Sequence, residues 1–377
     1  MSGRRTWAVA RKEFLHILRD PLSLLMALAL PLLMLLLFGW ALTLDVDRIP
    51  TLIHDADGSP RSRELIQRFA GSRYFDVRGY VDSYKTIQDE IDANRVLAGV
   101  VIPPDYSADL LAGRAAEVQV LLDGSDSNTA GIVLGYVRNL VAAHSEQVGA
   151  AAQERLTGER MKPPAEARLR VLYNSELESK NYIVPGLIAV ILMIIAGMMT
   201  SLTIAREWES GTMEQVLSTP LRPAEMALGK MAAYSVLGVA DTLLSILAGI
   251  FIFGVPFRGS VIFLGVSCGV FLVVALFWGI FLSAATRSQL LAYQASMLTS
   301  FLPAFLMSGF VFAIENMPPP IQLFTYIVPA RYFITMLTGI FLKGVGPEIL
   351  IGELAMLAVF GLVVFVLAVR SLRQKVA

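Results

Sequence analysis

Long apolar runs alternate with shorter polar segments along most of this chain. Four uncharged runs are long enough to cross a bilayer, which takes about 20 helical residues; they are residues 21–44, 181–205, 259–286 and 288–314. Two further runs are interrupted by one acidic residue each, Asp241 in Met231–Phe257 and Glu353 in Ile349–Val369, and they predict spans over 225–257 and 349–370. The pattern therefore predicts six membrane-spanning helices.

Between the first two apolar runs, residues 45–180 have the composition of a soluble domain. Short β-prone runs occur at Ile49–His54, Tyr74–Val81, Leu97–Ile102, Val118–Leu122 and Leu169–Tyr173. Helical patterns occur at Arg61–Ala70, at Ser83–Arg95 and from about Thr129 to Leu156. This alternation predicts an inserted α/β domain with a core of its own.

The first 20 residues have the pattern of an amphipathic helix that ends at Asp20-Pro21. Its apolar face would carry Trp7, Ala10, Phe14, Ile17 and Leu18, and its polar face Arg5, Lys12, His16 and Arg19. A helix of this kind lies in the plane of the membrane interface. The alternative is a charged flank without regular structure.

Residues 315–347 are apolar but contain four prolines, at 318, 319, 320 and 329. Prolines interrupt a helix, so this stretch is predicted to form short re-entrant or interfacial helices rather than another span.

Composition agrees with a membrane protein. Of the 377 residues, 55% are hydrophobic and 16% are charged, against about 25% charged in soluble domains. The 31 basic residues balance the 31 acidic ones, so nothing in the net charge favours a nucleic-acid partner. The single cysteine, Cys268, excludes an intrachain disulfide, and no metal site is expected.

The positions of the basic residues predict the orientation. Arginines and lysines gather before the first span, including Arg11 and Lys12, and after the last, including Arg370 and Arg373. Both ends and the tail 371–377 are therefore expected in the cytoplasm, with residues 45–180 outside. The first span is longer than a cleaved leader's apolar core and is expected to be a retained signal anchor.

Enzyme signatures are missing from the sequence. The three histidines, His16, His54 and His144, are far apart, and there is no H-E-x-x-H motif. A phosphate-binding G-x-x-x-x-G-K-[ST] loop is also absent, because Met231 follows Gly229-Lys230. We therefore expect neither an intramembrane hydrolase nor an ATP site of the chain's own.

The polar segment 206–224, between the second and third spans, has its own start and stop signals. Gly211 allows a sharp turn, and Thr212 with Gln215 fits a capping box in which each side chain bonds the other's N–H. Thr219-Pro220 disfavours helix beyond Ser218. The pattern predicts a short rigid helix that presents Glu214 to a cytoplasmic partner; the alternative is a solvated loop.

Two features inside the spans remain open from sequence. Asp241 is either part of a substrate path or a polar group in a helix-packing seam, because an acid inside a membrane faces a partner or a wet cavity. Gly265-x-x-x-Gly269 allows close helix approach, within one chain or between chains.

The segment AREWESGTMEQVLSTPLRPAEMALGK resembles the signature of type-2 ABC exporter permeases, particularly the bacterial multidrug-type group with a large extracytoplasmic insertion. The stretches RKEFLHILRDP, DGSDSNTA and LYNSELESKNYIVPGL agree, so the resemblance covers essentially the whole chain. It implies the type-2 ABC exporter fold, in the bacterial inner membrane.

In that family the short helix is the coupling helix, which sits in a groove of a separate ATP-binding subunit. The resemblance assigns this role to residues 212–218, with the supporting positions Arg206, Glu207, Gly211, Thr212, Glu214, Gln215, Ser218, Pro220, Glu225, Gly229 and Lys230. Ser210 departs from the basic residue expected there.

The resemblance also implies the partners. Two copies, or this chain and a paralogous permease, would pair and recruit two ATPase subunits that bind ATP and magnesium. The N-terminal helix would brace the same cytoplasmic surface, and the outer domain would cap the exit or receive a periplasmic adaptor protein. The expected substrate is hydrophobic or amphipathic, drug-like or lipid-like, and membrane lipids surround the spans.

The alternative is a membrane sensor or assembly factor that uses the outer domain for recognition. Against it, only residues 371–377 follow Arg370, too few for a cytoplasmic output domain.

Overall fold

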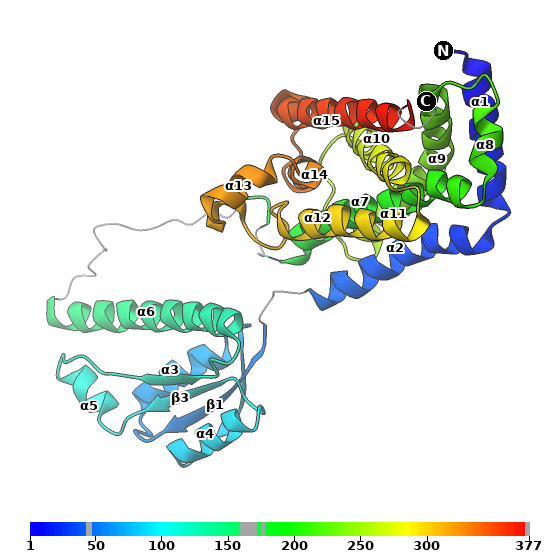
Figure 1. The fold of residues 1–377 in the computed structure, drawn as a ribbon. Helices are drawn as coiled ribbons and strands as arrows, with labels where there is room; N and C mark the ends of the chain where they lie inside the picture. Colours follow the sequence, from blue (N-terminus) through cyan, green and yellow to red (C-terminus); the bar gives the residue numbers. More distant parts are fainter. Residues whose placement is uncertain (43–46, 158–171, 175–177, 374–377) are drawn as a thin grey trace. The chain divides into compact units, whose positions relative to one another are not determined.

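The computed structural model describes residues 1–42, 47–157, 172–174 and 178–373. Its contacts divide the chain into two compact units, Met1–Thr43 with Arg170–Ala377, and Leu44–Leu169. The first is a bundle of helices and the second contains a β-sheet (Figure 1).

The helical unit is built from eleven α-helices in the described residues. They are α1 Gly3–Leu18, α2 Pro21–Ala41, α7 Lys180–Glu209, α8 Thr212–Leu217, α9 Pro223–Phe251, α10 Val261–Thr286, α11 Gln289–Ser296, α12 Leu302–Leu306, α13 Pro319–Thr325, α14 Pro329–Thr338 and α15 Pro347–Arg373. Two π-helical segments, η1 Met297–Phe301 and η3 Gly339–Lys343, and a 3₁₀ turn, η2 Ile314–Asn316, complete it.

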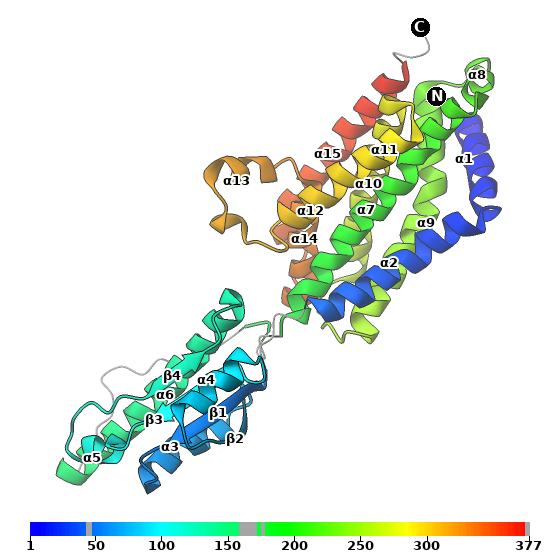
Figure 2. The same cartoon turned by 60° about the horizontal axis from the view of Figure 1, so that its bottom comes forward.

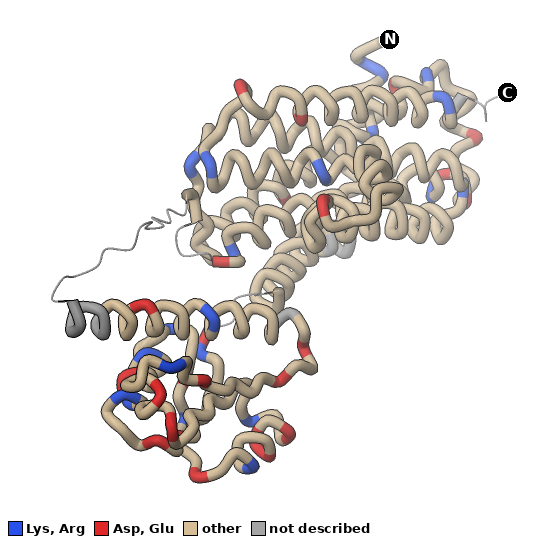
Figure 3. The backbone as a smooth tube through the Cα atoms, turned by 90° about the vertical axis from the view of Figure 1, so that its left-hand side faces the viewer, with Lys and Arg blue, Asp and Glu red and all other residues tan. Residues whose placement is uncertain are grey.

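Four of these helices are long and apolar enough to cross a membrane, namely α7, α9, α10 and α15. The first predicted span, residues 21–44, forms α2, which contains Pro31 and has a shorter apolar stretch, Ala27–Ala41. Residues 315–347 form α13 and then α14 with η3, bent by 79°. Charged residues are much sparser along this unit than along the other (Figure 3).

The predicted fifth span, residues 288–314, is shorter in the structure. The helical run α11, η1 and α12 ends at Leu306. Beyond it the chain bends, and Gly309 takes a φ of +87°, in the left-handed region that favours glycine. The uncharged run therefore extends beyond the end of the helix, which is why the predicted span was too long.

Helix α7 is the centre of the helical unit. It is buried along most of its length and contacts α2, α9, α10, α11 and α14 (Figure 2). The contact with α10 depends on Gly279, because a Cβ there would overlap Thr200 Oγ1 and the Gly197 carbonyl oxygen. One turn further along α10, Ser283 Oγ accepts hydrogen bonds from the backbone N–H groups of Ile204 and Ala205, at 2.9 Å each.

The packing face of the N-terminal helix matches the predicted one only in part. Ala10 and Ile17 are buried against the bundle, but Trp7, also on the predicted apolar face, is 69% exposed. Glu13 is buried beside them because its carboxylate meets Lys230 on α9. A charged side chain can lie on the packing face of a helix when an oppositely charged side chain from another helix pairs with it. The apolar periodicity of a single helix does not indicate such a pair.

The second unit is a four-stranded sheet in the order β2-β1-β3-β4. The strands are β1 Ile49–Asp55, β2 Phe75–Tyr80, β3 Ala98–Ile102 and β4 Gln119–Leu122. β1 pairs in parallel with β2 and β3, and β4 pairs antiparallel with β3. The predicted strand Leu169–Tyr173 falls largely outside the described residues, and its described part, Leu172 and Tyr173, is not a strand.

Four helices cover this sheet, α3 Pro60–Ala70, α4 Tyr84–Asp92, α5 Tyr106–Leu111 and α6 Ser127–Thr157. Side chains of α3, α5 and α6 share one core with Ile53 and Val100. Ile87 of α4 packs on the other face with Leu52 and Val101. Successive strand residues thus supply opposite cores, as the period of a strand requires.

A buried histidine should make this unit sensitive to acid. His144 on α6 bonds Tyr106 OH through Nε2 at 3.1 Å, and its Nδ1 has no partner among the described residues. Burial, with Arg68 nearby, lowers the pKa of His144 below its usual value. As the pH falls below about 6.5, the unfolded chain therefore binds a proton at His144 more readily than the folded unit does. The free energy of unfolding then decreases, by at most about 1.4 kcal/mol per pH unit.

We expect the urea midpoint of the unit to decrease from pH 7 to pH 5, and to decrease less in His144→Gln. Pulsed hydrogen exchange of α6 peptides at a fixed labelling pH, after equilibration in urea at each pH, would measure this. Equal pH dependence in both proteins would refute the role of His144.

Candidate coupling site

The segment between α7 and α9 forms the predicted short helix. Arg206 and Glu207 lie in the last turns of α7, so that helix extends past the predicted boundary at residue 205. Gly211 follows with a φ of 71°, and α8 begins at Thr212. Glycine adopts a left-handed backbone conformation without the steric penalty that a Cβ causes. Gly211 therefore allows the chain to turn sharply between α7 and α8.

The predicted capping box is wrong. Neither Thr212 nor Gln215 makes a side-chain cap on α8. Instead, Thr212 Oγ1 lies 2.9 Å from Ser210 Oγ and donates weakly to the Glu207 carbonyl oxygen at 3.4 Å. The turn at Gly211 directs the Thr212 hydroxyl back toward α7, so it is unavailable to the first turn of α8.

One side of α8 is fixed and the other is open. Met213 is 2% exposed and packs with Ile204 and Met226 of the neighbouring helices. The predicted docking residues Glu214, Gln215 and Ser218 are exposed, and Ser218 ends the helix as predicted from Thr219-Pro220. The arrangement is a short anchored helix with a free polar face, which suits docking and offers no catalytic group.

Two contacts tie the end of α7 to the turn between α10 and α11. The Glu209 carboxylate accepts hydrogen bonds from the Gln289 N–H at 2.7 Å and from its amide Nε2 at 2.5 Å. Arg287 lies over the Trp208 ring, 4.4 Å from its centre. No local signal in the sequence predicted these pairs.

Helix α1 holds the other end of the segment. Arg5 donates to the Pro220 carbonyl oxygen and lies 3.3 Å from the buried Glu225 carboxylate. Glu225 also accepts the N–H groups of Ser2, at 2.7 Å, and Arg222, at 3.0 Å. The Arg222 contact caps the first turn of α9.

Four charged side chains form an ion cluster where α1, α7 and α9 meet, namely Lys12, Glu13, Glu207 and Lys230; we call it the buried ion cluster because all but the exposed Lys12 are buried. Lys230 is 1% exposed, and its ammonium lies 2.9 Å from Glu13 Oε1 and 3.1 Å from Glu207 Oε1. Lys12 lies 2.8 Å from Glu207 Oε1 and 3.4 Å from Glu13 Oε1. Burial would raise the pKa of Glu13, but Lys230 and Lys12 outweigh it and lower that pKa.

Asp241 lies deep in α9 and is 3% exposed. Its Oδ1 accepts a long hydrogen bond from Ser245 Oγ, at 3.4 Å. The adjoining cavity, between α2, α7, α9 and α10, holds only about 10 Å³. Within a single copy of the chain this site has the geometry of the packing seam, the second of the two alternatives that the sequence left open.

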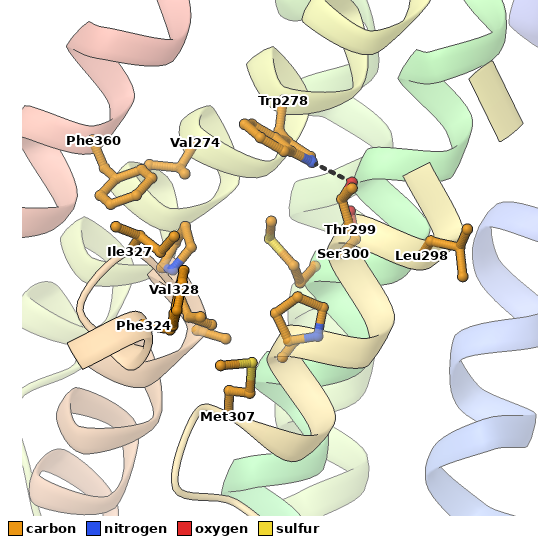
Figure 4. A pocket seen from close by; sticks show the side chains of 15 residues that line it. Val274, Trp278, Leu298, Thr299, Ser300, Met307, Phe324, Ile327, Val328 and Phe360 are labelled. Atoms are coloured by element: carbon orange, nitrogen blue, oxygen red, sulfur yellow. Dashed lines mark hydrogen bonds between the residues drawn. The ribbon is translucent and has the colours of Figure 1, made fainter. Parts of the chain in front are cut away.

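A larger cavity lies between α10, α12 and the α13–α14 segment and holds about 340 Å³ (Figure 4). Its walls are mostly apolar, including Val274, Met307 and Ile327. The indole N–H of Trp278 donates to Thr299 Oγ1 at 3.0 Å on one wall. Within the part of the chain that the structure describes, no charged side chain lines this cavity, so it suits an uncharged, largely apolar molecule. Nothing in the sequence indicated this cavity, because its walls come from α7, α10, η1, α12, α13, α14 and α15.

No group of three or more metal-ligating side chains occurs among the described residues. The sequence-predicted Gly265 and Gly269 have open space around them in this chain, so their close-approach motif does not pack within one copy.

Comparison with known proteins gives a consistent result. Residues 22–370 match the family model described as ABC-2 family transporter protein. The chain is 36% identical over 352 residues to the probable multidrug ABC transporter permease YbhS of Escherichia coli K12, covering 93% of this chain and 92% of that protein. It is 32% identical over 345 residues to the probable multidrug ABC transporter permease YbhR of the same strain, covering 92% of each.

A more distant relative is the inner membrane transport permease YhhJ of the same strain, 26% identical over 334 residues, which cover 87% of this chain and 86% of that protein. The resemblance inferred from the sequence is thus confirmed, and the chain belongs to the ABC-2 family of transporter permeases.

Proposed function

We propose that this chain is the membrane subunit of an ATP-driven exporter that moves a hydrophobic or amphipathic compound out of the bacterial cytoplasm or the inner leaflet. Two copies, or this chain and a paralogue, would form the pathway, and separate ATPase subunits would bind ATP and magnesium. The relatives named as multidrug permeases support the substrate class.

The observation that carries this proposal is the geometry of α8. Met213 and the ties at Glu209 and Arg5 fix the position of the helix, while its polar face stays exposed. A partner that binds the exposed face of α8 and displaces it would also displace the helices to which α8 is joined. A movement of the partner could therefore be transmitted to the membrane-spanning helices. Closure of the ATPase subunits would supply the differential binding energy between the two states.

Purification of the chain in mild detergent should recover an ATP-binding subunit, and transported compounds should stimulate ATP hydrolysis by that complex. Recovery of an active transporter without any such subunit would disprove the proposal.

The apolar cavity is the proposed site where substrate is held within one copy. Val274 lies in its wall and is 1% exposed. We expect Val274→Trp to fill the cavity and lower transport about tenfold, the equivalent of about 1.4 kcal/mol, while the complex still assembles. Uptake of a fluorescent substrate into inverted vesicles would measure it.

Val266→Trp is the matched control, since Val266 lies on the same helix and is 48% exposed. Equal transport by both variants would place the substrate elsewhere.

The proposed orientation has a direct test in a Cys268→Ser background. We expect Ser125→Cys, in the sheet-containing unit, to react with an impermeant thiol reagent in intact spheroplasts, and Ser371→Cys, near the end of α15, to react only after lysis. The reverse labelling pattern would overturn the orientation and leave α8 on the wrong side for an ATPase.

A further inference from the structure

Helix α1 is joined to the coupling segment, residues 206–224, on both sides of α8. Before α8, Glu207 at the end of α7 meets Lys12 of α1 in the buried ion cluster. After α8, the Pro220 carbonyl oxygen accepts a hydrogen bond from Arg5 of α1. Figure 2 shows α1 alongside α9, at the end of the bundle that carries α8. The helix therefore spans the base of the segment that we propose as the docking element.

The ion cluster is the strongest of these joints. Three of its four side chains are nearly inaccessible, at 1% for Lys230, 8% for Glu13 and 10% for Glu207. Separating Lys230 from both carboxylates would leave a buried ammonium without a countercharge, which is far more costly than losing an exposed pair. Displacement of one of the three helices is therefore resisted unless the other two follow.

The backbones of α1 and α9 also approach closely beside the cluster. A Cβ on Gly229 would lie 2.6 Å from Val9 Cβ and 2.9 Å from the Thr6 carbonyl oxygen. Gly229 contributes no side chain to this contact, so Val9 and the α1 backbone pack directly on α9 and little sliding is possible between the two helices. Only Arg19 and Asp20 stand between α1 and α2, so movement of α1 is passed on to α2.

The family resemblance implies that α1 braces this surface; we propose that Glu13 and Lys230 are the positioning residues that make α1 a strut, so that it moves together with α8 when the ATPase subunits close. The proposal rests on the proposed function and assigns no ATPase or substrate contact to either residue. Glu207 Oε2, which is buried and has no hydrogen-bond partner in the described part of the chain, leaves an acceptor for a rearranged cluster in the second state.

Charge exchange tests this joint. Glu13→Lys and Lys230→Glu each unbalance the cluster, whereas the double variant again places two positive and two negative groups there. We expect each single change to lower substrate-stimulated ATP hydrolysis at least about tenfold and the double change to restore at least about half of it. Lys85→Glu, at an exposed lysine of the other unit, is the control and should behave like wild type.

A readout on α1 separates coupling from folding. In a Cys268→Ser background, the exposed Ala8→Cys should change its maleimide labelling rate at least about threefold when a non-hydrolysable ATP analogue is added. The response should disappear in the single variants and return in the double variant. If the charged variants fail to accumulate, Glu13→Gln decides the question, since it keeps the size of the side chain but removes its charge.

The outcomes are distinct. A variant complex that binds the ATP analogue normally but loses the labelling response supports the strut. An unchanged response in Glu13→Gln, or a double variant no better than the singles, overturns it while the proposed function stands. A wild-type chain that associates with no ATPase subunit overturns both.

Discussion

Replacing Glu214 by lysine is expected to abolish the coupling of ATP hydrolysis to transport while leaving the amount of permease in the membrane unchanged. Glu214 is exposed in the first turn of α8, where a carboxylate favours the positive end of a helix and can meet a basic group of a partner. The substitution reverses both interactions without touching an apolar span. We expect transport and substrate-stimulated hydrolysis to fall at least about tenfold, with weaker recovery of the ATPase subunit.

The matched control is Glu117→Lys, the same charge reversal at an exposed position of the sheet-containing unit. It should leave coupling intact. If Glu214→Lys also behaves like wild type, and Gly211→Pro and Thr212→Val are equally silent, α8 is not a docking element.

The second large effect is expected at Gly279, where α10 meets α7. The Gly279 Cα packs directly against Thr200 Oγ1 and the Gly197 carbonyl oxygen, with no room for an added Cβ. Gly279→Val must force these two central helices apart, and overpacking of a tight core costs about 1–3 kcal/mol or more. It would also pull Ser283 away from the α7 backbone. We expect severe loss of folded protein, measured as monodisperse protein in detergent and as the melting temperature.

Gly265→Val is the control on the same helix, because a Cβ there has nothing within 4 Å. It should leave the melting temperature of a single copy unchanged. Equal melting temperatures for the two variants would show that α7 and α10 do not pack as described.

Much of the local structure could be predicted from the sequence. The apolar runs predicted the long helices α7, α9, α10 and α15 to within about six residues, because in each a predominantly apolar stretch coincides with a helix. Glycine and proline marked the limits of α8, since Gly211 takes a left-handed conformation and Pro220 cannot follow a helical residue easily. The four described strands followed their β-prone runs for the same local reason.

The long-range contacts could not be predicted in this way. Glu13 and Lys230 lie 217 positions apart, and each looked like part of a polar flank in its own helix. The pair became a packing element only when α1 met α9. The apolar cavity likewise depends on how several helices distant in sequence meet, and the surroundings of Asp241 depend on which helices enclose it. The capping box failed because Ser210 and the Glu207 carbonyl compete for the Thr212 hydroxyl.

The most direct test of the central claim, that α8 docks onto an ATPase subunit, is photo-crosslinking from α8 itself. A photoreactive amino acid at Gln215, which is exposed, should form an adduct with the ATP-binding subunit of the purified complex. The same group at Val239, which is 58% exposed on the apolar surface of α9, should not. Mass spectrometry of the adduct would identify the partner. An actively transporting complex in which Gln215 yields no adduct with an ATP-binding subunit would contradict the account.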